Sequence, residues 1–163
     1  MYEMNNNLII EKLSGKNFNE FVKLIEVFAN FEKFDPPDEK AKLRLKKDGL
    51  SKNPKYEAYL GKIGNKYVAY LIFFMTYASF IALPTLFLED MFILKEYRRK
   101  GIGKKILDLC MKFAKERNCG RVDLNVLDWN IDAIHFYKKN NFRFINWELY
   151  RLEREQIKNY PDN

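Results

Sequence analysis

The sequence predicts an α/β protein of the α+β kind, in which helices flank one mixed, mostly antiparallel sheet. Three observations predict it: two early segments with helical spacing, two strands at 56–63 and 67–77 joined by the two-residue turn 64–65, and a final strand–helix–strand–helix–strand unit. A chain of 163 residues is long enough to bury a stable core without disulfide bonds or bound metals. We therefore expect a single domain over residues 1–163.

The N-terminal part starts with a strand and two helices. The strand begins at 8–10, and Asn17 with a glutamate three residues later forms a capping box for the first helix. The apolar residues of this helix recur every three or four positions: Phe18, Phe21, Val22, Ile25, Phe28 and Ala29. The second helix covers 37–47, begins after a start signal at 35–38, and is stopped by Gly49.

An uncharged segment runs from 67 to 88, and a helix of this length could span a bilayer. Tyr, Phe, Val and Ile dominate the segment, which favours strands, and Pro84 interrupts it. We therefore expect two buried strands joined by a bend, the second of them at 86–94, and no membrane span.

The C-terminal part alternates helices and strands. A helix runs from Gly101 to the turn at 118–120 and presents its apolar residues on one face: Ile102, Ile106, Leu109, Cys110 and Phe113. A strand at 121–127, a short helix at 131–140 and a last strand at 142–152 follow. The charges that come after this strand, up to Lys158, indicate a solvated helix end.

The composition excludes several classes of protein. With 47% hydrophobic and 31% charged residues the chain is an ordinary globule, and its 16% of aromatic residues suits a core, a pocket or a subunit interface. Two cysteines form neither a disulfide framework nor a metal cluster, and a single histidine does not support a His-based metal site. The cysteine usage, and the absence of a signal pattern in residues 1–7, indicate a reduced, cytoplasmic setting.

The net charge of +7 indicates an anionic partner. Nucleic acid is one such partner, but no nucleic-acid-binding motif accompanies the charge. The densest basic cluster is a glycine loop, because six Lys or Arg against one acid lie between Lys95 and Lys105. A cofactor with several phosphates accounts for this cluster without nucleic acid.

This glycine loop, residues 98–104, lies between an apolar strand and a helix. Glycines allow the backbone to approach a ligand closely, and the first N–H groups of a helix attract negative charge. Two common phosphate loops do not match, because Lys105 stands where a Walker loop has a hydroxyl and Ile106 where a dinucleotide fingerprint has a small residue. The alternative without a ligand is a charged loop, capped by glycines, before a surface helix.

The Arg-x-x-Gly-x-Gly pattern over 98–103 resembles the acetyl-CoA pyrophosphate loop of the GCN5-related N-acetyltransferase (GNAT) family. Other segments resemble its diamine, spermidine/spermine and thialysine N-acetyltransferase subfamily, namely 31–33, 88–93, 129–130 and 134–139. The resemblance implies a sheet with a V-shaped splay between two parallel strands. It also implies acetyl-CoA in that gap, CoA as a product, and a homodimer.

The resemblance further implies which residues hold and use acetyl-CoA. The cofactor-binding residues would be Met91, Phe92, Ile93, Arg98, Arg99, Lys100, Gly101, Ile102, Gly103, Lys104, Asn130, Ala133 and Tyr137. A backbone N–H near Ile93 would stabilise the oxyanion, Asn130 would bind the pantetheine arm, and Tyr137 would protonate the leaving thiolate. The alternatives are a helix N-cap for Asn130 and plain packing for Tyr137.

Glu89 stands out because a carboxylate in the middle of an apolar strand is out of place for packing alone. We expect it to take the proton from the acceptor ammonium, directly or through a water, and a structural acid is the alternative. Asp90 faces the opposite side if the strand is regular, and a bulge, which the family has there, would change this.

The expected acceptor-binding residues combine three acids with two aromatic side chains: Phe31, Glu32, Phe80, Glu89 and Asp90. Three positions depart from the subfamily pattern. Phe31 replaces a tyrosine, Phe80 stands where some members carry tryptophan, and Asn141 replaces a glycine. The first two departures concern the expected amine pocket, so they affect the acceptor and leave the acetyl-CoA assignment unchanged.

The sequence thus predicts an acetyl-CoA-dependent N-acetyltransferase that acts by direct attack in a ternary complex. Its acceptor would be a primary amine of a small cationic molecule, such as a polyamine, a diamine or a lysine-like compound. A protein or peptide amine is an alternative acceptor, since acids near the pocket favour any cation. A regulatory or nucleic-acid-binding protein on the same scaffold is the alternative that is not an enzyme. We expect no metal and no membrane partner.

Overall fold

The computed structural model describes residues 7–161. The chain divides into two compact units, the first ending at Asn125 and the second beginning at Val126. Among the described residues, the first unit holds the whole sheet, three α-helices and the short 3-10 helix η1 (Lys95–Tyr97), and the second holds two short α-helices. The expectation that residues 1–163 form one domain stays a prediction.

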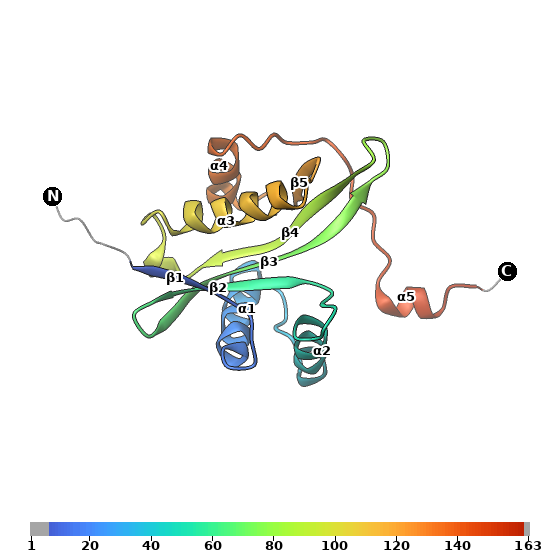
Figure 1. The fold of residues 1–163 in the computed structure, drawn as a ribbon. Coiled ribbons are helices and arrows are strands. Elements are labelled where there is room, and N and C mark those ends of the chain that lie inside the picture. Colours follow the sequence, from blue (N-terminus) through green and yellow to red (C-terminus); the bar gives the residue numbers. More distant parts are fainter. Residues whose placement is uncertain (1–6, 162–163) are drawn as a thin grey trace. The chain divides into compact units, whose positions relative to one another are not determined.

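The first unit is built on a five-stranded mixed sheet (Figure 1). In spatial order its strands are β1 (Leu8–Lys12), β2 (Glu57–Ile63), β3 (Lys66–Ala78), β4 (Leu83–Ile93) and β5 (Arg121–Leu124). The first four pair antiparallel with their neighbours, while β5 pairs parallel to β4. This arrangement confirms the predicted sheet, although β5 ends at Leu124 and not at the predicted residue 127.

The two predicted chain reversals, at 64–65 and between β3 and β4, each join a pair of antiparallel strands. Ile63 pairs with Lys66, so Gly64 and Asn65 form the β2–β3 hairpin, and Gly64 adopts a φ of 57° that glycine reaches without strain. The uncharged segment forms β3 and β4. In the part of the chain that the structure describes, no helix is long and apolar enough to cross a membrane.

Pro84 was expected to interrupt the uncharged segment, and this was wrong. It lies inside β4, paired with Tyr77, and the neighbouring Gly120 donates its backbone N–H to the Pro84 carbonyl oxygen at 2.9 Å. A proline is accepted here because it stands near the start of the strand, where its missing N–H removes little from the ladder.

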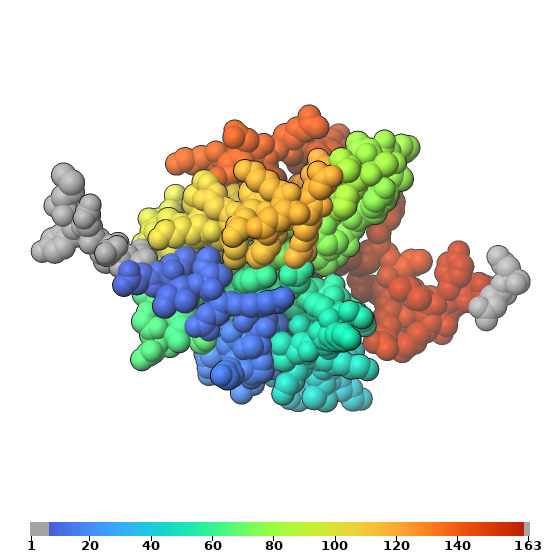
Figure 2. Space-filling model, viewed as in Figure 1, coloured from blue at the N-terminus to red at the C-terminus, as the bar shows by residue number. Residues whose placement is uncertain are grey.

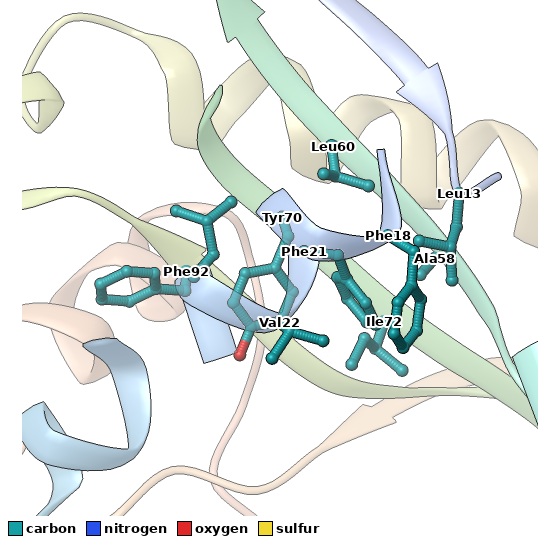
Figure 3. Close-up of a cluster of buried hydrophobic side chains, with 10 residues drawn as sticks. Leu13, Phe18, Phe21, Val22, Ala58, Leu60, Tyr70, Ile72 and Phe92 are labelled. Carbon is teal, nitrogen blue, oxygen red and sulfur yellow. The ribbon is translucent and has the colours of Figure 1, made fainter. Parts of the chain in front are cut away.

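Helix α1 (Phe18–Glu32) covers one face of the sheet. Its apolar face packs against β2 and β3 in a cluster that includes Phe21, Leu60, Tyr70 and Ile72 (Figure 3). The edge of the Tyr70 ring meets Phe21 at a centroid distance of 5.6 Å. The Tyr70 ring is therefore fully buried between the sheet and α1.

The predicted capping box of α1 was wrong. Asn17 occupies the N-cap, but its side chain makes no cap hydrogen bond. Its Oδ1 accepts from the Ser14 N–H at 2.8 Å, and its Nδ2 donates to the Lys12 carbonyl oxygen at 3.1 Å. The buried amide thus ties the loop between β1 and α1, and this tertiary role replaces the local cap.

Helix α2 (Glu39–Gly49) lies beside α1 (Figure 2). The helix begins two residues after the predicted start at 37. Asp38 caps it by accepting from the Ala41 N–H at 2.6 Å. Gly49 is the last residue of the helix and was expected to stop it. A Cβ at Gly49 would collide with the ring of Tyr56, so close packing also favours glycine here.

Helix α3 (Ile102–Glu116) packs on the opposite face of the sheet. Phe113 meets Tyr59 and Phe73 at ring-centroid distances of 5.0 and 5.3 Å. These two residues alternate with those that face α1, as the period of two in a strand requires. The buried residues of α3 are Ile102, Ile106, Leu107, Cys110 and Ala114.

The second unit contains α4 (Ile131–Lys139) and α5 (Arg154–Lys158). The solvated helix predicted near the end of the chain is confirmed by α5, all of which is exposed. The strand predicted at 142–152 was wrong, since these residues adopt neither strand nor helix. An alternating sequence becomes a strand only when a neighbour completes its hydrogen bonds, and within the described residues no strand pairs with this segment.

Candidate active site

A β-bulge shapes the middle of β4. Ile72 of β3 pairs with Asp90 and Phe73 pairs with Leu88, so Glu89 is an extra residue on β4. A bulge bends its strand and re-aims the neighbouring side chains. In a regular strand Glu89 and Asp90 would face opposite sides of the sheet, whereas here both line one cavity. The alternative that the sequence left open, a bulge at this position, is confirmed.

This acceptor cavity, as we name it, lies within the first unit and has a volume of about 440 Å³. Its walls come from α1, α2, the loop before β2, β3 and β4, through Ile25, Leu45, Lys55, Tyr56, Ile72, Phe74, Glu89 and Asp90. The lining is mostly apolar, with two carboxylates and one ammonium. Such a cavity suits a small molecule that carries charge at defined positions.

Asp90 is the carboxyl group that its surroundings perturb most. Burial, together with the negative charges of Glu89 and Glu32, raises the pKa of Asp90 to about 7, although the hydrogen bond from Tyr70 acts in the opposite direction. The Tyr70 hydroxyl donates to Asp90 Oδ2 at 3.2 Å, and burial raises the pKa of Tyr70 well above its usual value. Asp90 therefore exchanges a proton near neutral pH while Tyr70 stays protonated as a donor.

The three predicted acids share one electrostatic environment. Glu89 is exposed on the bulge, Asp90 is partly buried, and Glu32 lies at the C-terminal end of α1, where burial raises its pKa. Removing the charge of Glu89 or of Glu32 would ease the ionisation of Asp90. A cation bound among them is favoured for the same reason.

The two predicted aromatic residues lie outside the cavity lining. Phe80 lies in the turn between β3 and β4 with a fully exposed side chain (104%). Phe31 is partly exposed near the end of α1, and its ring centroid lies 4.9 Å from the guanidinium carbon of Arg98. The structure thus joins Phe31 to the glycine loop.

The glycine loop forms an anion-binding backbone. Arg99 and Gly101 have positive φ angles of 62° and 77°, and Gly101 is the N-cap of α3. No side chain caps this helix and its first turn contains no acid. The first helical bond from the loop is the Lys105 N–H to the Gly101 carbonyl oxygen, so the N–H groups of 102–104 are left for an anion.

The Arg98 guanidinium makes one hydrogen bond and two ring contacts within the protein. Its Nε donates to the Ile93 carbonyl oxygen at 2.9 Å, and its guanidinium carbon lies 5.7 Å from the Phe92 ring centroid as well as against Phe31. The arginine therefore connects the end of β4 to the end of α1. Phosphate binding was the role expected from the sequence, and this positioning role was not foreseen.

In the second unit, Asn130 and Tyr137 belong to α4. Asn130 caps the helix by accepting from the Ala133 N–H at 3.2 Å, which confirms the N-cap alternative. Tyr137 is buried, and its ring packs edge-on against Phe136 and Phe142 at centroid distances of 5.3 and 5.4 Å. Their roles toward acetyl-CoA stay predictions.

Comparison with known proteins decides the family. Residues 21–142 match the model of the acetyltransferase (GNAT) family. The chain belongs to this family. The strand, glycine loop and helix described above are thus those of a GNAT acetyltransferase.

Named relatives of this GNAT chain act on different amines. An L-ornithine N5-acetyltransferase from Arabidopsis thaliana is 38% identical over 108 residues, which cover 64% of this chain and 47% of that protein. The chain thus spans about half of that relative. A thialysine N-epsilon-acetyltransferase from Sus scrofa is 26% identical over 164 residues, covering 93% and 96%. An aminoglycoside N-acetyltransferase solved with CoA shares the fold, with a TM-score of 0.76 at 12% identity over 94% of this chain and 99% of that one.

The sequence did not point to three side chains in or next to this cavity. Tyr70 donates to Asp90, while Lys55 and Tyr56 form part of the wall. Tyr70 carried a weak signal, because its position on a buried strand face requires a partner for its hydroxyl. Lys55 and Tyr56 line the cavity because of how the loop before β2 folds. No local sequence pattern predicts the path of this loop.

Proposed function

We propose that this GNAT protein transfers the acetyl group of acetyl-CoA to a primary amine of a small cationic acceptor, by direct attack in a ternary complex. The observation that carries the proposal is the cavity in which the β4 bulge presents two carboxylates, on the strand that precedes the glycine loop. Two relatives are named for ornithine and thialysine acetylation, which supports a small amine.

The start of α3 fits the pyrophosphate of acetyl-CoA. A free set of helix N–H groups, positive φ angles that turn the loop, and the absence of an acid in the first turn all favour a doubly charged anion. Arg99, Lys100 and Lys104 would add positive charge, and Ile102 with Gly103 would supply backbone N–H groups. When bound, acetyl-CoA supplies an activated thioester carbonyl.

The carboxylates of the cavity bind and deprotonate the acceptor. An ammonium has no lone pair, so the acceptor must lose a proton before it can attack. Glu89, on the bulge, accepts this proton at a carboxylate oxygen, directly or through a water. Asp90 and Glu32 hold the positive charge of the acceptor until the proton leaves.

The remaining groups of the proposal are those that the sequence predicts, near Ile93 at the end of β4 and at α4. The backbone N–H near Ile93 donates to the developing oxyanion, and Tyr137 donates its hydroxyl proton to the leaving sulfur. The side chain of Asn130 caps α4, so its amide N–H groups would serve the pantetheine arm while its Oδ1 serves the helix.

The test is thiol release from acetyl-CoA with a panel of amines: polyamines, diamines, lysine-like amino acids and lysine-containing peptides. We expect turnover with free amines. Turnover with peptides alone would favour the protein-amine alternative. Tight nucleic-acid binding, with no turnover of any amine, would exclude the enzyme and favour the regulatory alternative.

We also propose that two copies of the chain associate. Large apolar side chains in the segment 142–152 are exposed, among them Phe144, Trp147, Leu149 and Tyr150. Apolar surface of this extent marks an interaction site in a stable protein. Light scattering should give twice the mass of the chain, and a monomer at all concentrations would contradict the dimer.

A further inference from the structure

We propose that Lys55 binds an anionic group of the acceptor and so makes the cavity selective for amines that also carry a carboxylate. This inference rests on the proposed function, since it concerns the same cavity. Among the residues that line the cavity, Glu89 and Asp90 are the acids and Lys55 is the one base. An acceptor bound there meets negative charge at one wall and positive charge at another.

The sheet separates the two sides of the cavity. Ala58 of β2 pairs with Ile72 of β3, which pairs with Asp90 of β4, so two strand spacings separate the first from the last. Because neighbouring strands lie about 4.8 Å apart, this distance is roughly 10 Å. Lys55 precedes β2 by two residues, on the side of the sheet where the long lysine side chain reaches into the cavity wall. An acceptor with an ammonium at one end and a carboxylate at the other can therefore meet the acids at one side of the cavity and Lys55 at another.

The loop that carries Lys55 is held against α2. The Lys55 N–H donates to the Asp48 carbonyl oxygen at 3.0 Å, and the next residue, Tyr56, donates its hydroxyl to the Leu45 carbonyl oxygen at 2.8 Å. These bonds hold the Lys55–Tyr56 segment against α2. The fold therefore fixes the backbone from which the Lys55 side chain extends.

The Lys55 ammonium keeps capacity for a ligand. Its Nζ lies 3.0 Å from Asp48 Oδ1, but an ammonium has three donors and the side chain is 74% exposed. Exposed ion pairs contribute little, so sharing Lys55 with a ligand carboxylate costs little. A diamine would instead bring its second ammonium toward Lys55, where like charges repel.

The experiment compares acceptors that differ by one group. L-ornithine and 1,4-diaminobutane differ only in the α-carboxylate, as do L-lysine and 1,5-diaminopentane. We expect the wild-type protein to have the higher kcat/KM for the amino acid of each pair. Lys55→Glu should lower this preference by up to about fivefold, the upper end of what an exposed charge contact contributes.

A matched variant separates the cavity from the net charge. Lys52 is exposed in the same loop and does not line the cavity, so Lys52→Glu changes the net charge equally. We expect it to leave the preference unchanged. Asp48→Asn, which removes the competing carboxylate of Lys55, should raise the preference for the amino acid.

The outcomes distinguish this inference from the proposed function. If both acceptors of a pair react and Lys55→Glu leaves their ratio unchanged, or if the wild type prefers the diamine, the role of Lys55 is wrong while the acetyltransferase stands. If no amine reacts, the proposed function is wrong, and calorimetric binding of L-ornithine and 1,4-diaminobutane to the wild type and Lys55→Glu still tests Lys55. Equal binding of both ligands would then reject it.

Discussion

The glycine loop and the acceptor cavity are built in opposite ways. The loop offers backbone N–H groups from consecutive residues, turned by positive φ at Arg99 and Gly101. The cavity offers side chains from several elements that are far apart in the sequence. A backbone site suits a ligand common to a family, whereas a side-chain site can change its ligand by substitution. The comparison predicts that variants of the two regions affect different substrates.

The largest effect should come from the bulge. Glu89→Gln keeps the shape of the side chain and removes its ability to accept a proton. Turnover should fall by about 10²- to 10⁴-fold, the usual contribution of a general base. Because the glycine loop is untouched, the Kd of acetyl-CoA, measured by calorimetry, should stay within about twofold, well below a tenfold change of 1.4 kcal/mol.

A high-pH measurement refines this test. If Glu89 removes a proton from the ammonium, raising the pH toward the pKa of the free amine should restore part of the lost turnover. Full activity of Glu89→Gln at neutral pH would show that Glu89 is a structural acid, and would leave Asp90 as the candidate base.

The next effect concerns Asp90 and the free energy of unfolding. Burial raises the pKa of Asp90 from 3.8 to about 7, so between these pH values the folded protein holds a proton that the unfolded chain has released. Stability therefore falls as the pH rises through this window, and the full cost, up to roughly 4 kcal/mol, is present above it. Asp90→Asn should remove this cost, so the variant should be more stable than the wild type at pH 8 and nearly equal at pH 4.

Urea unfolding at the two pH values measures the difference. Asp35→Asn, at an exposed position, is the control, and because it keeps Asp90 its stability should follow that of the wild type at both pH values. In activity, the wild type should lose kcat/KM for a cationic acceptor as the pH falls through about 7, because Asp90 becomes neutral. A wild-type profile that is flat there would contradict the burial of this carboxyl.

The two regions also differ in how far the sequence predicts them. The loop was predicted because its glycines, its cations and the start of α3 are contiguous and act through local backbone geometry. The sequence predicted which carboxylates belong to the site. That both line one cavity depends on the bulge, which is a property of strand register. Tyr70 and Asp90 are 20 residues apart, and Lys55 enters through a loop, so only the fold brings them together.

The errors in the fold have the same origin. Asn17 was expected to cap α1 and instead ties the preceding loop, because a tertiary partner replaced a local one. The segment 142–152 was expected to be a strand and has no strand partner among the described residues. Local patterns predicted the helices and the antiparallel strands well, since these depend on period and on turn residues such as Gly64.

A smaller effect should come from Gly101, and only on the cofactor side. Gly101→Ala places a Cβ on a residue with a φ of 77°, which costs about 1–2 kcal/mol in backbone strain. The KM for acetyl-CoA should rise while the KM for the amine stays constant. Gly15→Ala is the matched control, because a Cβ there also meets open space but without a positive φ. An equal rise in both KM values would show that the loop and the cavity are not separate.

The smallest effect, at Arg98, tests where the boundary between the two regions lies. Arg98→Lys keeps the charge but loses the Nε bond to the Ile93 carbonyl oxygen and the planar contact with Phe31. If Arg98 positions β4 and α1, the KM for the amine should rise by about threefold to tenfold, as for one lost hydrogen bond, while the KM for acetyl-CoA changes less. Arg99→Lys makes the same chemical change one residue later and should instead affect acetyl-CoA. If Arg98→Lys raises mainly the KM for acetyl-CoA, Arg98 is a phosphate ligand, and the first residue of the glycine motif belongs wholly to the cofactor site.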